Sequence, residues 1–168
     1  MATLNASITL SLGATLVNAL DLGDVTQNVN NASNFALTDG TGANQAKSLF
    51  SDTRTLAASG TENLDLAATL IDAFGAAITF TKIKALIIKA SAANTNDVVV
   101  GGHATAACFS FFGAATHTLK VKPGGMIALV APDANGYPVT ATTADMLTVT
   151  NSAGGTGVTY DVIIIGVA

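Results

Sequence analysis

Apolar and polar residues alternate most regularly at the start of the chain. From Thr3 to Leu12 every second residue is apolar, and those between are Thr, Asn or Ser. This period of two places the apolar side chains on one face of a β-strand. The pattern predicts a half-buried strand that ends at Gly13. Residues 14–20 fit a second strand or a short helical turn, and we favour the strand.

The next stretch, residues 21–34, is polar and rich in asparagine. Asparagine favours turns, and a segment with so few apolar residues cannot form a core of its own, so we predict a loop or linker. Asp39-Gly40 is a strong turn signal. We therefore place an approximate boundary near residue 50, between an N-terminal segment (1–50) and a main domain (51–168).

From residue 51 onward, short β-prone runs alternate with turn residues at a regular spacing. This spacing is typical of an all-β sandwich, and a jelly roll is the closed arrangement we expect for about eight such strands. No long amphipathic helix stands out. The expected runs are 53–57, 63–67, 77–80, 82–90, 98–100, 108–112, 118–122, 126–131, 137–141, 146–150 and 156–166.

Composition points to a weakly charged surface. Of the 168 residues, 49% are hydrophobic and only 11% are charged, and Ala and Thr together supply about a third of the chain. Such a surface is a liability for a free monomer but suits an assembly in which neighbours cover it. No apolar run approaches the ~20 residues that span a bilayer, so we expect no membrane segment.

The lysines fall mainly on two predicted strands, with Lys82, Lys84 and Lys89 on one and Lys120 and Lys122 on the other. The net charge of −4 and the 5% aromatic content argue against a nucleic-acid partner. Solvated strand ends are the plain interpretation of these lysines. The alternative is a cationic face that docks on an acidic protein surface.

Residues capable of chemistry are sparse. His103, Cys108 and His117 lack the spacing of a zinc site, and Asp133–Gly136 and Asp39–Gly42 are interpreted as turns rather than calcium loops. No paired carboxylates, serine triad or phosphate-binding loop is apparent. We therefore predict a protein that is not an enzyme, with no metal, cofactor or small-molecule substrate.

Two parts of the chain carry a resemblance. One is Leu49–Ala58 with Asp72–Gly75 and Ala85–Lys89. The other is Val121–Gly125, Ala131–Asp133, Asp145–Ser152 and Val158–Gly166. Residues 49–168 resemble the small β-rich virion proteins of tailed bacteriophages, among them the jelly-roll decoration (cement) proteins of capsids. These motifs are turn and strand patterns, and the family has no catalytic residues to transfer.

The resemblance implies a virion protein that binds the major capsid protein on the outer surface of the shell, as a homotrimer, and stabilises the shell. A component of the tail, baseplate or head fibre is the alternative, and a carbohydrate-binding module on the virion is a third. Copy number in purified particles separates the first two, and a glycan array tests the third.

The N-terminal strand suggests a specific mode of assembly. We expect Thr3–Leu12 to be an arm whose strand is completed by another copy or by the capsid protein, as in β-augmentation. The alternative is that it is the first strand of the subunit's own sheet. The candidate assembly contacts are Leu4, Ile8, Leu10, Leu12, Lys82, Lys84, Lys120 and Lys122.

Overall fold

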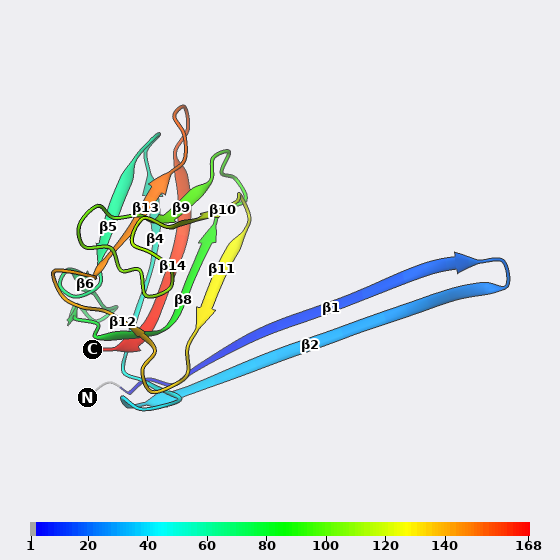
Figure 1. Ribbon diagram of the computed structural model, residues 1–168, viewed down its shortest axis with the longest axis horizontal. Helices are drawn as coiled ribbons and strands as arrows, with labels where there is room; N and C mark the ends of the chain where they lie inside the picture. The colour runs from blue at the N-terminus through cyan, green and yellow to red at the C-terminus, as the bar shows by residue number, and fades with distance from the viewer. Residues whose placement is uncertain (1–2) are drawn as a thin grey trace.

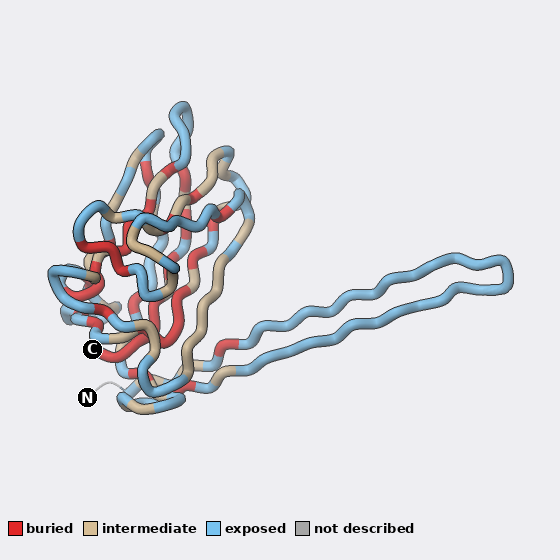
Figure 2. Tube along the Cα trace, viewed as in Figure 1, coloured by how far each residue is buried: buried red, intermediate tan, exposed pale blue. Residues whose placement is uncertain are grey.

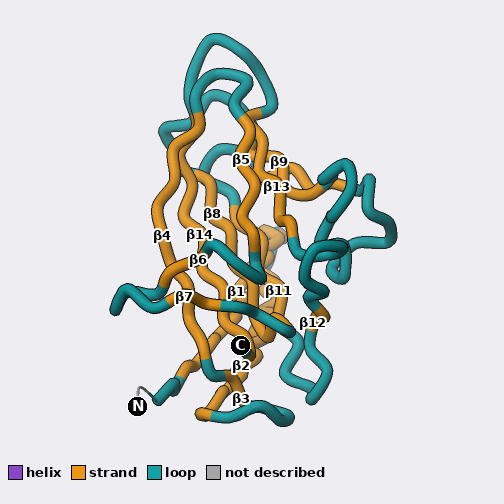
Figure 3. The backbone as a smooth tube through the Cα atoms, turned by 90° about the vertical axis from the view of Figure 1, so that its left-hand side faces the viewer, coloured by secondary structure: helices purple, strands orange, loops and turns teal. Residues whose placement is uncertain are grey.

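A computed structural model describes residues 3–168 of the chain, and in this range it is all-β, with no helix. Two sheets pack face to face as a β-sandwich (Figures 1 and 3). In the first sheet the strand order is β11 (Met126–Val130), β8 (Lys82–Ala90), β14 (Val158–Val167) and β4 (Ser48–Leu56), with β12 (Tyr137–Pro138) paired to the start of β8. In the second it is β10 (Thr118–Val121), β9 (Val98–Gly101), β13 (Met146–Asn151) and β5 (Thr61–Asp65).

The main core fills the space between the two sheets. Alternate residues of β8 and β14, such as Leu86, Ile88 and Ile164, meet Val100 and Leu147 of the second sheet, and all five are fully buried. A short ribbon of β6 (Leu70–Ile71) and β7 (Ala77–Ile78) adds Leu70 and Ile78 to the same core. The all-β sandwich predicted from the regular turn spacing is confirmed.

A long hairpin leaves the bottom of the sandwich. It consists of β1 (Ala6–Leu20) and β2 (Gly23–Asp39), paired antiparallel without interruption from Ala6↔Leu37 to Leu20↔Gly23. Every residue from 9 to 34 is exposed, and Figure 2 shows this part projecting far from the rest of the molecule. At ~3.4 Å per residue, residues 9–20 span about 40 Å. We call residues 9–34 the arm, and residues 6–8 and 35–39 its base.

Two sequence-based predictions fail here. The stretch 21–34, predicted as a loop, is largely strand β2, and the strand containing Thr9 and Leu10 is completed by β2 of the same chain, not by a neighbour. Polar residues form this strand because β1 supplies a hydrogen-bonding partner, and burial is not needed for the ladder. Residues 14–20 form a strand as predicted, but the expected end at Gly13 is wrong, because β1 continues through that residue.

Two further details differ from the prediction. Cys108–Phe112, expected to be β-prone, lies in an irregular segment that touches the second sheet through a single bridge, Ala107↔Met146. Leu119, expected inward on β10, is 39% exposed, whereas Val121 is buried as expected. Strand β4 starts at Ser48, just before the division predicted near residue 50.

Candidate interaction surface

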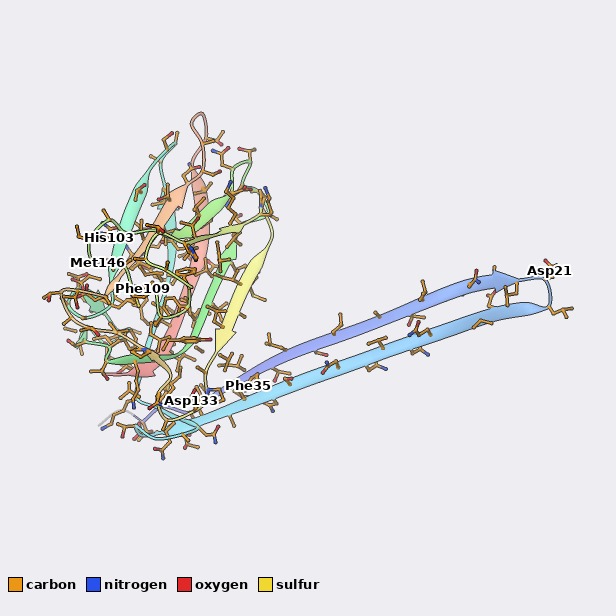
Figure 4. The ribbon with its side chains drawn as sticks, in the orientation of Figure 1. Asp21, Phe35, His103, Phe109, Asp133 and Met146 are labelled. Atoms are coloured by element: carbon orange, nitrogen blue, oxygen red, sulfur yellow. The ribbon has the colours of Figure 1, made fainter. Side chains whose placement is uncertain are left out.

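The base of the hairpin is fixed to the sandwich by a second, small apolar cluster. Ile8 and Leu37, which come from β1 and β2, pack against Ala85 of β8 and Ile165 of β14, and all four are buried. Phe35 is half-buried at the edge of this cluster, and Figure 4 places it where the arm meets the sandwich. Ala85 and Ile165 face away from the main core, so the hairpin packs on the outer face of the first sheet.

Backbone hydrogen bonds reinforce this attachment. β2 pairs in parallel with the short strand β3 (Gln45–Ala46), and the Thr38 N–H donates to the Asn44 carbonyl at 3.0 Å. The Lys47 N–H donates to the Gly166 carbonyl of β14 at 2.8 Å, and the Asn44 N–H donates to the Pro132 carbonyl at 2.7 Å. The base is therefore held by the first sheet and by the loop that follows β11.

Lys84 connects the loop before β3 with the loop after β11. A bulge in β8 leaves Lys84 without a partner in β14, because Ile165 pairs with Ala85 and Gly166 with Ile83. Its ammonium group donates to the carbonyls of Gly42 (3.2 Å) and Asp133. Burial, followed by the charge of the neighbouring Lys82, lowers the pKa of Lys84. This side chain is fully buried, so the interpretation of Lys84 as part of a solvated strand end is wrong.

The loop that receives Lys84 is itself ordered by a carboxylate. Oδ1 of Asp133 accepts hydrogen bonds from the N–H groups of Asn135 (2.7 Å) and Gly136 (3.1 Å). These bonds lower the pKa of Asp133. The segment Asp133–Gly136 is thus a turn, as the sequence predicts, and it stands beside the arm base (Figure 4).

The arm has two unlike faces. Residues paired across the hairpin share a face, so Leu10, Leu12, Leu16 and Leu20 of β1 lie with Val25 and Val29 of β2. We call this side the apolar arm face. The opposite face presents Ser, Thr and Asn, as in the pair Thr15–Asn28, where the hydroxyl donates to the amide oxygen at 2.9 Å. The apolar arm face is the continuation of the side that carries Ile8, Phe35 and Leu37 at the base.

Apolar exposure along this face is large. Leu12 is 58% exposed, Leu16 is 68% exposed, and Leu22 at the tip is fully exposed. Residues 9–34 carry charge only at the tip, on Asp21 and Asp24, and Figure 4 shows Asp21 at the far end. A long ribbon that is charged only at its tip and has two free edges is the kind of structure that pairs with other chains unless something covers it.

The outer face of the first sheet is also apolar beyond the arm base. Two rows of directly paired residues cross it: Val130–Ala85–Ile165–Leu49, and next to it Ala128–Ile87–Ile163–Ser51. Ala128, Ile87 and Ile163 are half-buried, and Ile163 packs against the base cluster. The third row is polar apart from Met126 and contains Lys89, Asp161 and Thr53. We call the residues Leu49, Ile87, Ala128, Val130 and Ile163 the sheet patch.

The predicted assembly contacts separate into different environments. Ile8 is buried in the base and Leu4 is half-buried beside it, whereas Leu10 and Leu12 lie on the apolar arm face. The Lys82 ammonium donates to the Ala134 carbonyl at 2.7 Å, and that of Lys122 forms a 2.8 Å ion pair with Asp97. Lys120 is exposed and has no ion pair among the described residues.

The histidine and cysteine side chains have local roles. Nδ1 of His103 accepts a hydrogen bond from the Ala106 N–H at 3.0 Å and so caps a turn. Cys108 is buried, and burial raises the pKa of its thiol. Within residues 3–168, no three His, Cys, Asp or Glu side chains gather as metal ligands do.

Comparison of the chain with protein-family models, curated proteins and solved structures gave no match. In the part of the chain that is described, no helix is long and apolar enough to cross a membrane.

Sequence reasoning missed the largest part of the interaction surface, namely the second strand of the arm and the sheet patch. Val25 and Val29 stand among polar residues, and their shared face with Leu16 depends on the hairpin register. The patch arises because four strands place apolar residues on the solvent side, which no single strand reveals. The strand Lys82–Ala90 has apolar residues on both faces, and that pattern is the one signal that indicated it.

Proposed function

We propose that this chain is a structural protein of a tailed-bacteriophage virion that acts through assembly rather than catalysis. The role we assign is a decoration protein that binds the outer capsid surface as an oligomer, a trimer in the simplest form, and stabilises the shell. The observation that carries the proposal is the arm, a ribbon about 40 Å long with an apolar face open to solvent over residues 9–34.

The arm supports an assembly role for an energetic reason. Fixing the backbone of a residue costs ~1–2 kcal/mol of conformational entropy, which folded proteins offset largely by burying side chains. Leu12 and Leu16 remain mostly exposed, so their burial can contribute only when another surface covers them. A protein that works within a lattice of neighbours supplies such a surface.

The strand order supports a finer description of the sandwich as a jelly roll. The orders β11-β8-β14-β4 and β10-β9-β13-β5 require the chain to cross between the sheets repeatedly, from β4 to β5 to β8 to β9, and again from β10 to β11 to β13 to β14. A jelly roll has eight strands in two sheets with Greek-key connections. It is the arrangement implied by the resemblance of residues 49–168 to capsid decoration proteins.

The test is the amount and effect of the chain on purified particles of the virus that encodes it. We expect quantitative mass spectrometry to find the chain at a copy number on the scale of the major capsid protein. The capsid shells of particles stripped of the chain are expected to break open at a lower temperature than those of intact particles. Adding the purified chain back is expected to restore the original temperature. A copy number as low as that of a tail component would refute the capsid role and favour a role in the tail. Absence of the chain from the particles would refute the proposal as a whole.

A further inference from the structure

The sandwich and the arm each expose an apolar surface, and the two already meet once within the subunit. At the base, Ile8 and Leu37 pack on Ala85 and Ile165. These four residues belong to the apolar side of the hairpin and to the outer face of the first sheet. The contact shows that apolar side chains on this side of the hairpin pack on this face of the sheet.

The apolar arm face has no partner within the subunit, and the sheet patch is covered only in part. Val130 and Ile163 pack against the base cluster, whereas Ile87 and Ala128 do not belong to it. Beyond Phe35 the arm runs away from the sandwich, so Leu12 and Leu16 are out of reach of their own sheet (Figures 1 and 2). The outer face of the sheet continues from Ala85 and Ile165 to Ile87 and Ala128, which lie outside the base cluster. A contact between the free arm and the patch must therefore come from two different copies.

From this geometry we infer that the apolar arm face of one copy packs on the sheet patch of a neighbouring copy. Resting on the proposed function, this inference names the contact that makes the oligomer. One contact of this kind covers both exposed apolar surfaces, whereas packing of arm on arm would leave Ile87 and Ala128 uncovered. Lys89, Asp161 and Thr53 then form a polar border beside the apolar centre, as in ordinary protein interfaces.

The size of the contact favours a ring over a single pairwise contact. Four strands ~4.8 Å apart, over about five residues of ~3.4 Å each, give a patch of roughly 300 Å². Each contact thus covers roughly 300 Å² per partner, less than the ~800 Å² of a standard interface. Each copy makes two such contacts, one with its arm and one with its patch, and a closed ring holds all of them at once. Because donor and acceptor surfaces differ, the contact is heterologous, and a ring such as a trimer is a closed assembly that it can form.

The experiment uses three variants of the full chain, examined by sedimentation velocity without any virus particle. The arm variant carries Leu12→Asn and Leu16→Asn. The sheet variant carries Ile87→Thr and Ala128→Gln, two directly paired residues of the sheet patch. The control variant carries Val17→Asn, which changes an exposed apolar residue of β1 on the opposite face of the arm.

We expect the wild type and the control variant to sediment as the same oligomer, and the arm and sheet variants each to be monomeric. An equal mixture of these two is expected to form a 1:1 complex, because intact arms meet intact patches. A sheet variant that remains oligomeric shows arm-on-arm packing and overturns the inference, and so does a monomeric wild type. Circular dichroism verifies the folding of each variant, and Ala128→Gln alone replaces the sheet variant if that variant does not fold. Because no particle is present, the result is independent of the copy-number test of the proposed function.

Discussion

The attachment of the arm rests on a small cluster, and Leu37→Ala tests its strength. Leu37 is 1% exposed and packs with Ile8, Ala46, Ala85 and Ile165. Truncation of a buried leucine to alanine costs 2–5 kcal/mol, from lost burial and the cavity that remains. Ala85 and Ile165 lie on the central strands β8 and β14, whose other faces form the main core. We therefore expect the whole sandwich to lose about 3 kcal/mol of unfolding free energy.

The assay is urea denaturation at a concentration where the protein is monomeric. With a slope of roughly 2 kcal/mol per molar urea, the midpoint falls by about 1.5 M. Leu12→Ala is the matched control, since it makes the same change in the same hairpin at a residue that is 58% exposed, and we expect it to shift the unfolding free energy by less than ~0.5 kcal/mol. A loss below about 1 kcal/mol for Leu37→Ala would refute the reasoning, because the base would then not belong to the folding unit of the sandwich.

Three further substitutions test the polar and backbone features. The Tyr160 ring lies in the core, and its hydroxyl donates to the half-buried Glu62 at 2.6 Å, so Tyr160→Phe is expected to cost about 1.5–3 kcal/mol in denaturant titrations. Burial and Glu62 raise the pKa of Tyr160, so the wild type loses stability above the ordinary tyrosine pKa and the variant lacks this loss. The pKa of Lys84 is lowered in the folded chain, so just below the ordinary lysine pKa the unfolded chain binds more protons than the folded chain. The stability of the wild type therefore rises with pH in that range, and melting curves of Lys84→Met are expected to lack that rise. Gly136→Ala forces a side chain at φ +60° into the Ile83 carbonyl, 2.6 Å from the new Cβ, and is expected to lower the melting temperature more than Gly155→Ala, which also has a positive φ but open space around it.

The success and failure of the sequence-based predictions follow from what shapes each element. Strands such as Lys82–Ala90 and Val158–Val167 were predictable because burial between two sheets imposes a clear apolar pattern on them. Strand β2 was not predictable from the sequence, because residues 24–34 are exposed on both sides and only their pairing with β1 keeps them extended. A ladder leaves no signature in composition, and asparagine-rich segments otherwise favour turns.

The candidate contacts show the same division. Leu10 and Leu12 were identified by alternation, which marks a face correctly but does not say whether the face meets its own core or solvent. Lys84 was misinterpreted because its environment depends on a bulge, and a single extra residue redirects a side chain without changing the local sequence pattern. The sheet patch depends on the register of four strands, which is known only once the strands are paired in the folded structure.

A shortened hairpin provides the most direct test of assembly through the arm. Replacing residues 11–32 by an Asn-Gly turn joins Leu10 to Ser33, a pair with the same place in the ladder alternation as Leu20↔Gly23 at the native turn. Ile8, Phe35 and Leu37 stay in place, so the variant is expected to fold and melt like the monomeric arm variant. The measurement is the amount of this variant retained on stripped virus particles, relative to the wild type, by quantitative mass spectrometry. We predict that the wild type binds and that the folded variant does not; equal retention of both would contradict the account.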